Sequence, residues 1–342
     1  MKQRALRSAA QILLRSPLAP LLGRGRLTGA DAALDPQLAA VLAAQRLLRL
    51  PGLHTMDPAR ARAFAEEGLA PLDVAPAAMA EVIDLGVPGP RGPIPARIFV
   101  PPAAEPSWIV YFLGGGGVIG SIRSSEPATR LIAAQTRCVV ASVGYRLGPE
   151  HRHPAGIEDA CAAWDALTAR ASRAGAARIA VAGDSFGGFL AAHVDRHARV
   201  AGSRRPDLQV QIYPTTDLAH DVPSIERYAD GYLLTSAMID WFSDHYFAAG
   251  DDRRAPSPLR WPDLTGAAPA LITTAGFDPL VDEGDRYAAR LAAAGALARH
   301  RRYPALIHGY LSLAGGVAAA RAAVDELCRD ITELLHGGPS AG

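Results

Sequence analysis

The sequence is poor in the features that mark several classes of protein. Its three cysteines, Cys138, Cys161 and Cys328, lie far apart and form no C-x-x-C pair. An odd number of widely spaced cysteines is unlike a disulfide framework or a zinc site, and it favours a reducing cytoplasm. Lysine and arginine (35) balance aspartate and glutamate (34), so the formal net charge is +1. A near-neutral chain has no electrostatic footprint for nucleic acid, and we expect no such partner.

Long apolar runs are also missing. Residues 1–30 are basic, with no acidic residue before Asp31, but Arg15 interrupts the short apolar run at 12–14. A signal peptide needs ~7–15 apolar residues in a row and a membrane span needs ~18. We therefore expect no stable membrane span. The segment is interpreted as an amphipathic helix that covers the domain, with contact to a membrane surface as the alternative.

What the chain has instead is an alternation of short apolar runs with alanine-rich segments. Two strand-like runs, 82–85 and 96–100, flank a turn rich in proline and glycine at 88–93. The further strand-like runs are 108–112, 138–143, 179–182, 208–212, 271–274 and the polar run 300–303. The helix-length segments between them include 156–174, 187–201 and 284–295. This alternation is typical of an α/β fold, a mostly parallel sheet with helices on both faces.

Two regions depart from this alternation. Apolar residues recur at near-helical spacing early in the chain, and we expect N-terminal cap helices within residues 1–75. Residues 217–260 carry aromatic residues at helical spacing, and we expect them to form a cap insertion over the end of the sheet. The core domain is then divided between residues 76–216 and 261–338.

The sharpest local motif is GDSFGG at residues 183–188. It follows the strand-like run 179–182 directly and precedes an alanine-rich helix. A G-x-S-x-G motif between a strand and a helix is a nucleophile elbow, in which a tight turn exposes the hydroxyl of the serine, here Ser185. The start of the helix also directs backbone N–H groups toward developing negative charge.

A serine hydroxyl is a weak nucleophile, so it needs a base. In this arrangement the base is a histidine that comes late in the chain, after the acid. His300, His308 and His336 are the candidates. His308 is favoured because it follows the run 300–303, where a loop would lie at the carboxyl edge of the sheet. His300 begins that run, and His336 lies near the end of the last helix.

The acid should follow an earlier strand. Asp278 comes shortly after the run 271–274 and lies nearest to its end. Asp282 and Glu283 are better explained as the start of the next helix, where acidic side chains are favourable. We therefore favour Asp278 as the residue that orients the histidine.

Four glycines, residues 114–117, follow the run 108–112 and Leu113. Glycines let the backbone pass close to a substrate, and backbone N–H groups at this place can hold an oxyanion. The run lacks the Gly-Lys-Ser/Thr ending of a P-loop and the spacing of a dinucleotide-binding motif. An oxyanion loop is the better interpretation.

Together these motifs resemble the hormone-sensitive-lipase-like family (family IV) of bacterial esterases, within the α/β-hydrolase superfamily. The matching stretches are 109–120, 144–151, 183–188, 231–235, 277–284 and 307–310. The resemblance implies an α/β-hydrolase fold with a helical cap, no metal and no organic cofactor, and it makes a homodimer an expectation. The site residues it implies are Ser185, Asp278 and His308 for the triad and Gly115, Gly116 and the N–H of Phe186 for the oxyanion hole.

The sequence departs from the family pattern at three positions. The family's loop is usually His-Gly-Gly-Gly followed by an aromatic residue, whereas here Leu113 replaces the histidine and Gly117 the aromatic residue. The residue after the serine is usually alanine and is here Phe186. The donors are backbone groups, so they remain. We hypothesise that Phe186 fills the space that Gly117 vacates near the acyl pocket.

The activity implied is hydrolysis of small, short-acyl carboxylic esters through an acyl-enzyme. The alternatives are an amidase, a lactonase or a specialised ester hydrolase with the same triad, and a small-molecule receptor without catalysis. The pocket is expected between the cap and the carboxyl edge of the sheet, and ordinary packing within the cap is the alternative for each of its residues. The expected pocket residues are Leu113, Gly117, Tyr232, Leu233, Leu234, Trp241 and Phe242.

Overall fold

The structure is a computed structural model that describes residues 32–68 and 72–337. The amphipathic helix expected within residues 1–30 lies outside the described residues.

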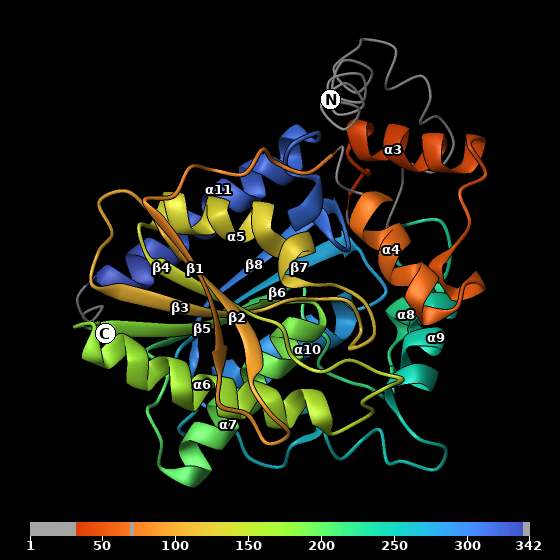
Figure 1. Cartoon of the computed structure of the whole chain (residues 1–342). Helices are drawn as coiled ribbons and strands as arrows, with labels where there is room; N and C mark the ends of the chain where they lie inside the picture. The colour runs from red at the N-terminus through yellow and green to blue at the C-terminus, as the bar shows by residue number, and fades with distance from the viewer. Residues whose placement is uncertain (1–31, 69–71, 338–342) are drawn as a thin grey trace.

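The centre of the molecule is an eight-stranded sheet with the order β1-β2-β4-β3-β5-β6-β7-β8 (Figure 1). The strands are β1 (Glu81–Val87), β2 (Ile94–Val100), β3 (Ser107–Phe112), β4 (Val139–Val143), β5 (Arg178–Asp184), β6 (Leu208–Ile212), β7 (Ala270–Phe277) and β8 (Leu297–Ile307). Neighbours from β4 to β8 pair in parallel, whereas β2 is antiparallel to both β1 and β4. The carboxyl ends of the parallel strands therefore meet at one edge.

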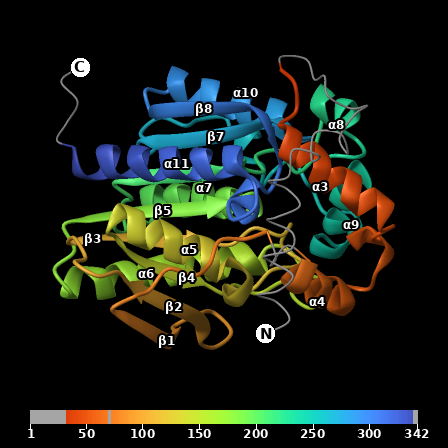
Figure 2. The same cartoon turned by 90° about the horizontal axis from the view of Figure 1, so that it is seen from above.

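Helices cover both faces of this sheet (Figures 1 and 2). One face carries α5 (Ile122–Thr136) and α11 (Ala318–His336). The other face carries α6 (Ala155–Arg173), α7 (Phe186–Ala201) and α10 (Val281–Ala293). Because both faces are covered, every residue of β3, β4, β6 and β7 is buried, as expected for continuous apolar strands. The predicted α/β-hydrolase fold is confirmed.

A second group of helices gathers beyond the carboxyl ends of the parallel strands (Figures 1 and 2). It consists of α3 (Pro36–Leu47), the 3₁₀ turn η1 (Leu53–Thr55), α4 (Pro58–Gly68), α8 (Pro223–Arg227) and α9 (Ser236–Tyr246). Capping fixes where two of them begin. The Asp35 side chain accepts from the first-turn N–H groups of α3, and the Thr235 hydroxyl accepts from the N–H of Met238 in α9.

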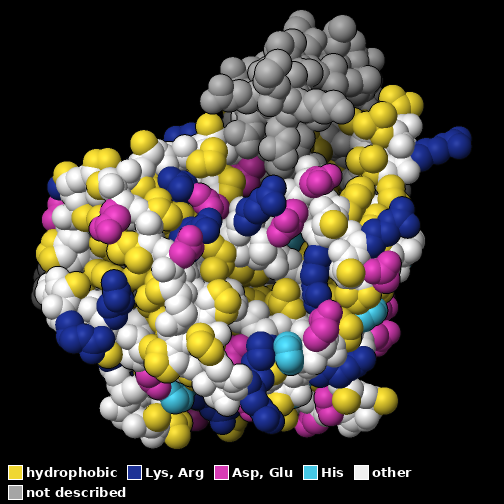
Figure 3. Space-filling view, viewed as in Figure 1, with side chains coloured by type: hydrophobic (Ala, Val, Ile, Leu, Met, Phe, Trp, Pro, Cys, Tyr) yellow, Lys and Arg dark blue, Asp and Glu magenta, His cyan; other side chains and the backbone are white. Residues whose placement is uncertain are grey.

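Charged side chains of both signs are interspersed over the face seen in Figure 3. Many of them are paired: Arg97, for example, contacts Asp84 and Glu126, each at 2.6 Å. Within residues 32–68 and 72–337, no helix has both the length and the apolar character needed to cross a bilayer.

Candidate active site

Ser185 occupies the sharp turn between β5 and α7. Its backbone has a φ of 51° and a ψ of −118°, a strained conformation for a residue with a side chain. Glycines on both sides permit the turn. A Cβ at Gly183 would collide with the carbonyl of Gly187, and a Cβ at Gly187 with the carbonyl of Phe112. The turn places Ser185 in the wall of a cavity at the N-terminal end of α7.

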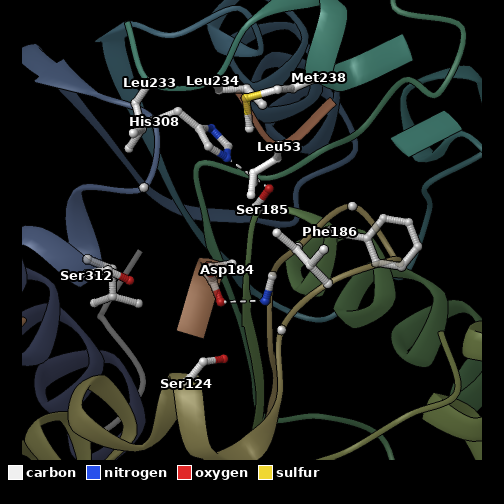
Figure 4. Close-up of a pocket in the computed structure, with 18 of the residues that line it drawn as sticks. Leu53, Ser124, Asp184, Ser185, Phe186, Leu233, Leu234, Met238, His308 and Ser312 are labelled. Carbon is white, nitrogen blue, oxygen red and sulfur yellow. Dashed lines mark hydrogen bonds between the residues drawn. The ribbon is translucent and has the colours of Figure 1, made fainter. Parts of the chain in front are cut away.

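His308 bridges Ser185 and Asp278. Its Nε2 lies 2.9 Å from the Oγ of Ser185 (Figure 4), and its Nδ1 lies 2.8 Å from Oδ2 of Asp278. The three side chains follow β5, β7 and β8, whose carboxyl ends lie at the same edge of the sheet. A carboxylate only accepts hydrogen bonds, so Nδ1 carries the proton and the lone pair of Nε2 faces the serine hydroxyl.

Asp278 is almost completely buried, with 1% of its side chain exposed. Its second oxygen, Oδ1, accepts the backbone N–H of Leu280 at 2.8 Å. Both oxygens are thus occupied, one by the backbone and one by His308. This fixes the carboxylate in the orientation in which it holds the imidazole.

The other candidate acids and bases lie elsewhere. Asp282 and Glu283, at the start of α10, accept backbone N–H groups from residues 216–224. His300 pairs with an acidic residue of α10 on the flank of the sheet, and His336 approaches the first residue of β3, at the opposite end. Of the three candidate histidines, the structure brings only His308 to Ser185.

The glycine run after β3 also reaches Ser185. Gly115 and Gly116 have φ values of 117° and 61°, which favour glycine. Along the part of the chain that the structure describes, the N–H groups of Gly115, Gly116 and Phe186 donate to no protein group. All three residues line the cavity beside Ser185. Backbone donors are rarely left unpaired, so three together suit an anion that forms during a reaction.

The cavity over Ser185 has a volume of about 770 Å³. In Figure 4, His308, Leu233, Leu234 and Met238 lie on one side of Ser185. The opposite side carries polar groups, among them Ser124, Ser312 and the carboxylate of Asp184. A largely apolar cavity with a few polar groups at its base suits a small organic ligand.

Part of the expected pocket was wrong. Leu113, Leu233, Leu234 and Phe242 line the cavity, but Gly117, Tyr232 and Trp241 do not.

Packing explains the three exceptions. The ring of Tyr232 lies against Phe277, at 5.4 Å between centroids. Trp241 packs against the following turn of its own helix, α9. At Gly117, a Cβ would lie 2.7 Å from the ring of Tyr246, so this glycine faces packed side chains rather than the cavity. Helical spacing groups side chains in sequence, but it does not say which side of the helix faces the cavity.

Several lining residues were missing from the expected pocket. Those labelled in Figure 4 are Leu53, Ser124, Asp184, Met238 and Ser312. Leu53 belongs to η1, and the only signal for it was the expectation that N-terminal helices cover the end of the sheet. Ser124 comes shortly after the glycine run and Ser312 shortly after His308, but no motif marks either residue.

The sheet, the strained serine turn and the Ser–His–Asp hydrogen bonds define the chain as an α/β hydrolase with a serine-centred site. A family model described as alpha/beta hydrolase fold matches residues 109–312. The chain belongs to this family, in its hormone-sensitive-lipase-like branch.

Curated relatives and solved structures agree with this placement. The chain is 38% identical to the carboxylic ester hydrolase LipN of Mycobacterium tuberculosis over 89% of this chain and 85% of the relative. It is 35% identical to the ethyl acetate hydrolase of Pseudomonas putida over 82% of this chain and 92% of the relative. A solved ester hydrolase from the metagenome of Lake Arreo, in complex with a bipyridine phosphonate derivative, is 37% identical with a TM-score of 0.83. The match covers 87% of this chain and 98% of that one.

Proposed function

We propose that the protein is a serine carboxylesterase that hydrolyses small esters through an acyl-enzyme. The observation that carries the proposal is the position of His308, within 2.9 Å of Ser185 and 2.8 Å of Asp278. A buried carboxylate, an oriented imidazole and a serine in a strained turn together form an activated nucleophile. A receptor that merely binds a ligand has no use for this arrangement.

In the acylation half-reaction, the Oγ of Ser185 attacks the carbonyl carbon of the ester while Nε2 of His308 takes the hydroxyl proton. Asp278 stabilises the imidazolium that forms. The negative charge moves to the former carbonyl oxygen, where the unpaired N–H groups of Gly115, Gly116 and Phe186 would hold it. The C–O bond to the alcohol then breaks, and His308 returns the proton to the leaving oxygen.

In the deacylation half-reaction, water attacks the acyl carbon of the acyl-enzyme. His308 again takes a proton, now from the water, and the same three N–H groups hold the second oxyanion. The bond to the Oγ of Ser185 breaks, Ser185 regains its proton from His308, and the carboxylic acid leaves. The cycle consumes one water and no cofactor.

The substrate class is proposed from the cavity and from the relatives. An apolar cavity of about 770 Å³ accommodates a small ester, and two relatives are named for carboxylic ester hydrolysis and ethyl acetate hydrolysis. The rings of Phe186 and Tyr246 fill the space beside Gly117, which closes the region behind the oxyanion loop. We therefore propose a preference for short acyl groups.

The test is the hydrolysis of p-nitrophenyl acetate and butyrate by the wild type, Ser185→Ala and Ser312→Ala. Ser312 lines the same cavity, and in the described chain its hydroxyl contacts no histidine. Ser185→Ala should lose at least ~10⁴-fold in kcat, whereas Ser312→Ala should stay within a few-fold of the wild type. Equal rates for the wild type and Ser185→Ala would refute the proposal. Matched amides and lactones in the same assay decide which bond is preferred.

We also propose a cap, a location and an oligomeric state. Helices α3, α4, α8 and α9 form a cap over the core, since η1 and α9 both line the cavity. The three free cysteines fit a reducing cytoplasm. The edge strand β8 leaves one side of the sheet unpaired and suits a homodimer, which light scattering would test.

A further inference from the structure

The oxyanion loop has no polar side chain in residues 113–117 that could hold it in place. Residues 114–117 are glycines, and the loop begins with Leu113, whose side chain has no polar atom. Glycine is the most flexible residue, yet backbone donors stabilise an oxyanion only when they are held in position before the reaction. The groups that hold this loop must therefore come from other elements.

One such group is the carboxylate of Asp184, the residue directly before Ser185. Its Oδ1 accepts the N–H of Gly114 at 2.9 Å and the hydroxyl of Tyr111 at 2.6 Å (Figure 4). A Cβ at Gly114 would lie 2.5 Å from Oδ2 of Asp184, so only glycine lets the loop and the segment of Asp184 come this close. The contact ties the oxyanion loop to the nucleophile turn.

A second group is the hydroxyl of Tyr145, in the loop that follows β4. It donates to the carbonyl oxygen of Leu113 at 2.9 Å, and Tyr145 is only 4% exposed. The carbonyl of Leu113 and the N–H of Gly114 belong to the same peptide unit. That unit is therefore held at both ends, by Tyr145 on one side and by Asp184 on the other.

The far end of the loop is also attached. The carbonyl of Gly117 accepts the N–H of Gly148 at 2.8 Å, and the carbonyl of Gly115 accepts the N–H groups of Val118 and Ile119, each at 3.0 Å. The fixed points lie on both sides of Gly115 and Gly116. Among the described residues, the N–H groups of Gly115 and Gly116, in the middle of the loop, have no protein acceptor and can receive an oxyanion.

We propose that Asp184 and Tyr145 are positioning residues, which hold the Leu113–Gly114 peptide so that the next N–H groups point at the oxyanion. Tyr111 in turn orients Asp184. The inference rests on the proposed function, because it assigns a purpose to donors that matter only if Ser185 forms a tetrahedral intermediate. In the described chain, neither side chain forms a hydrogen bond with Ser185 or His308.

Asp184 also admits a different explanation, since it is half-buried near His308 and its charge would act on an imidazolium formed there during the reaction. Burial raises the pKa of Asp184, and its hydrogen bonds from Tyr111 and Gly114 oppose that rise. A role through charge predicts that Asp184→Asn and Asp184→Ala are equally damaging. A positioning role predicts that Asp184→Asn is mild, because the amide oxygen still accepts from Gly114, and that Asp184→Ala is severe.

The experiment measures kcat and KM for p-nitrophenyl acetate and the inhibition constant of a trifluoromethyl ketone, which forms an oxyanion adduct with the serine. Tyr145→Phe should lower kcat by ~5- to 30-fold, less than the ~10²–10³-fold loss of a whole oxyanion donor, with KM changed less than twofold. The inhibition constant should rise by the same factor as kcat falls. Asp184→Asn should stay within ~3-fold of the wild type, and Asp184→Ala should lose more than Tyr145→Phe.

The matched control is Tyr303→Phe. Tyr303 is a partly buried tyrosine on β8 whose hydroxyl also donates to a backbone carbonyl, that of Ala323 at 3.2 Å, away from the loop. It should leave kcat and the inhibition constant unchanged. Unaltered inhibition in Tyr145→Phe, or equal losses in Asp184→Asn and Asp184→Ala, would overturn the inference. A wild type that is active but not through Ser185 would instead overturn the proposed function, so the two failures are distinguishable.

Discussion

The triad and the oxyanion loop are held in place in opposite ways. In the triad, the side chains that carry the chemistry hold one another: Asp278 orients His308, and His308 contacts Ser185. In the loop, the chemistry belongs to the backbone, and the contacts come from side chains of other elements, Asp184 and Tyr145. The proposed triad is thus held by its own side chains, whereas the oxyanion loop is held by side chains of neighbouring elements.

This difference decides which substitutions matter. Changing a residue of the proposed triad would remove a participant in the proposed reaction. Changing the loop residue Leu113 removes no donor, because its carbonyl and the N–H of Gly114 stay where they are. We therefore expect effects to be large at the triad, intermediate at the residues around the loop and small at the side chain of the loop itself.

The largest effect on kcat among the substitutions described below should come from Asp278→Asn, in the proposed triad. An asparagine amide can donate to Nδ1, which moves the imidazole proton to Nε2 and leaves no base facing Ser185. We expect kcat to fall by ~10⁴-fold while the fold is retained. Asp282→Asn, in the same segment but bonded to the backbone of Ser224, is the control and should stay within a few-fold. An Asp278→Asn variant that keeps a tenth of the wild-type kcat would contradict the expectation that the triad is more sensitive to substitution than the residues around the loop.

Phe186 should show an intermediate effect that falls on specificity. Its ring is buried against Phe189 and Tyr246, each at 4.9 Å between centroids, and its tip lies near Gly117. Phe186→Leu opens space beside the loop but keeps the backbone N–H. We expect kcat/KM for p-nitrophenyl hexanoate to rise ~10-fold relative to the acetate.

The control for this change is Phe189→Leu, one turn further along α7. Phe189 touches Phe186 but does not line the cavity, so its loss should lower stability without altering acyl preference. If Phe186→Leu leaves the preference for acyl length unchanged, the hypothesis that Phe186 fills the space vacated by Gly117 near the acyl pocket is wrong.

The sequence predicted the architecture because strand and helix patterns follow from local chemistry. Each of the eight predicted strand runs overlaps one strand, but the run at 300–303 covers less than half of β8. The reason is that β8 lies at the edge of the sheet, where half-buried and exposed residues alternate along most of its length. Arginines such as Arg299 and Arg301 lie on the half-buried side and pair with Asp330 of α11. Half of an edge strand is polar, so no apolar run marks its full length.

For the candidate site, the sequence predicted the residues that carry the proposed chemistry, including the backbone donors of the glycine run, but it did not predict the contacts that hold this backbone in place. A serine between glycines, and a histidine and an aspartate after strands, can be found by type and position. The contacts of Asp184 and Tyr145 join segments about 70 and 32 residues apart to a peptide group, which has the same chemistry in every sequence. The pocket residues Tyr232 and Trp241 were misplaced for a related reason, because only tertiary packing decides which face of a segment meets the cavity.

A smaller effect is expected where the cap helix α4 supports the far end of the loop. The guanidinium of Arg62 donates to the carbonyls of Val118 and Gly148 and pairs with Glu150 at 2.6 Å. This pair lowers the pKa of Glu150 to about 2. Glu150 is half exposed, so Glu150→Gln should cost no more than about 1 kcal/mol of unfolding free energy, with kcat within ~3-fold of the wild type.

The pH dependence of that cost has a definite sign. The folded-state pKa of Glu150 lies below its usual value near 4.5, so the pair stabilises the fold fully above that value. The difference in unfolding free energy between the wild type and Glu150→Gln should be constant from about pH 5 to 8. It should shrink as the pH falls from about 4.5 toward 2. If this difference in unfolding free energy instead grows on acidification, the ion pair between Glu150 and Arg62 is not its cause.

The smallest effect is expected at the most unusual residue of the loop. Leu113→Met keeps the volume and apolar character of a side chain that is 3% exposed, and it leaves the peptide held by Tyr145 and Asp184 untouched. We expect kcat and KM for p-nitrophenyl acetate within ~2-fold of the wild type, and a loss of less than about 1.5 kcal/mol in unfolding free energy. If Leu113→Met instead lowers kcat as much as Tyr145→Phe does, the loop depends on its own side chain. The claim that the loop is held by side chains of other elements would then be wrong.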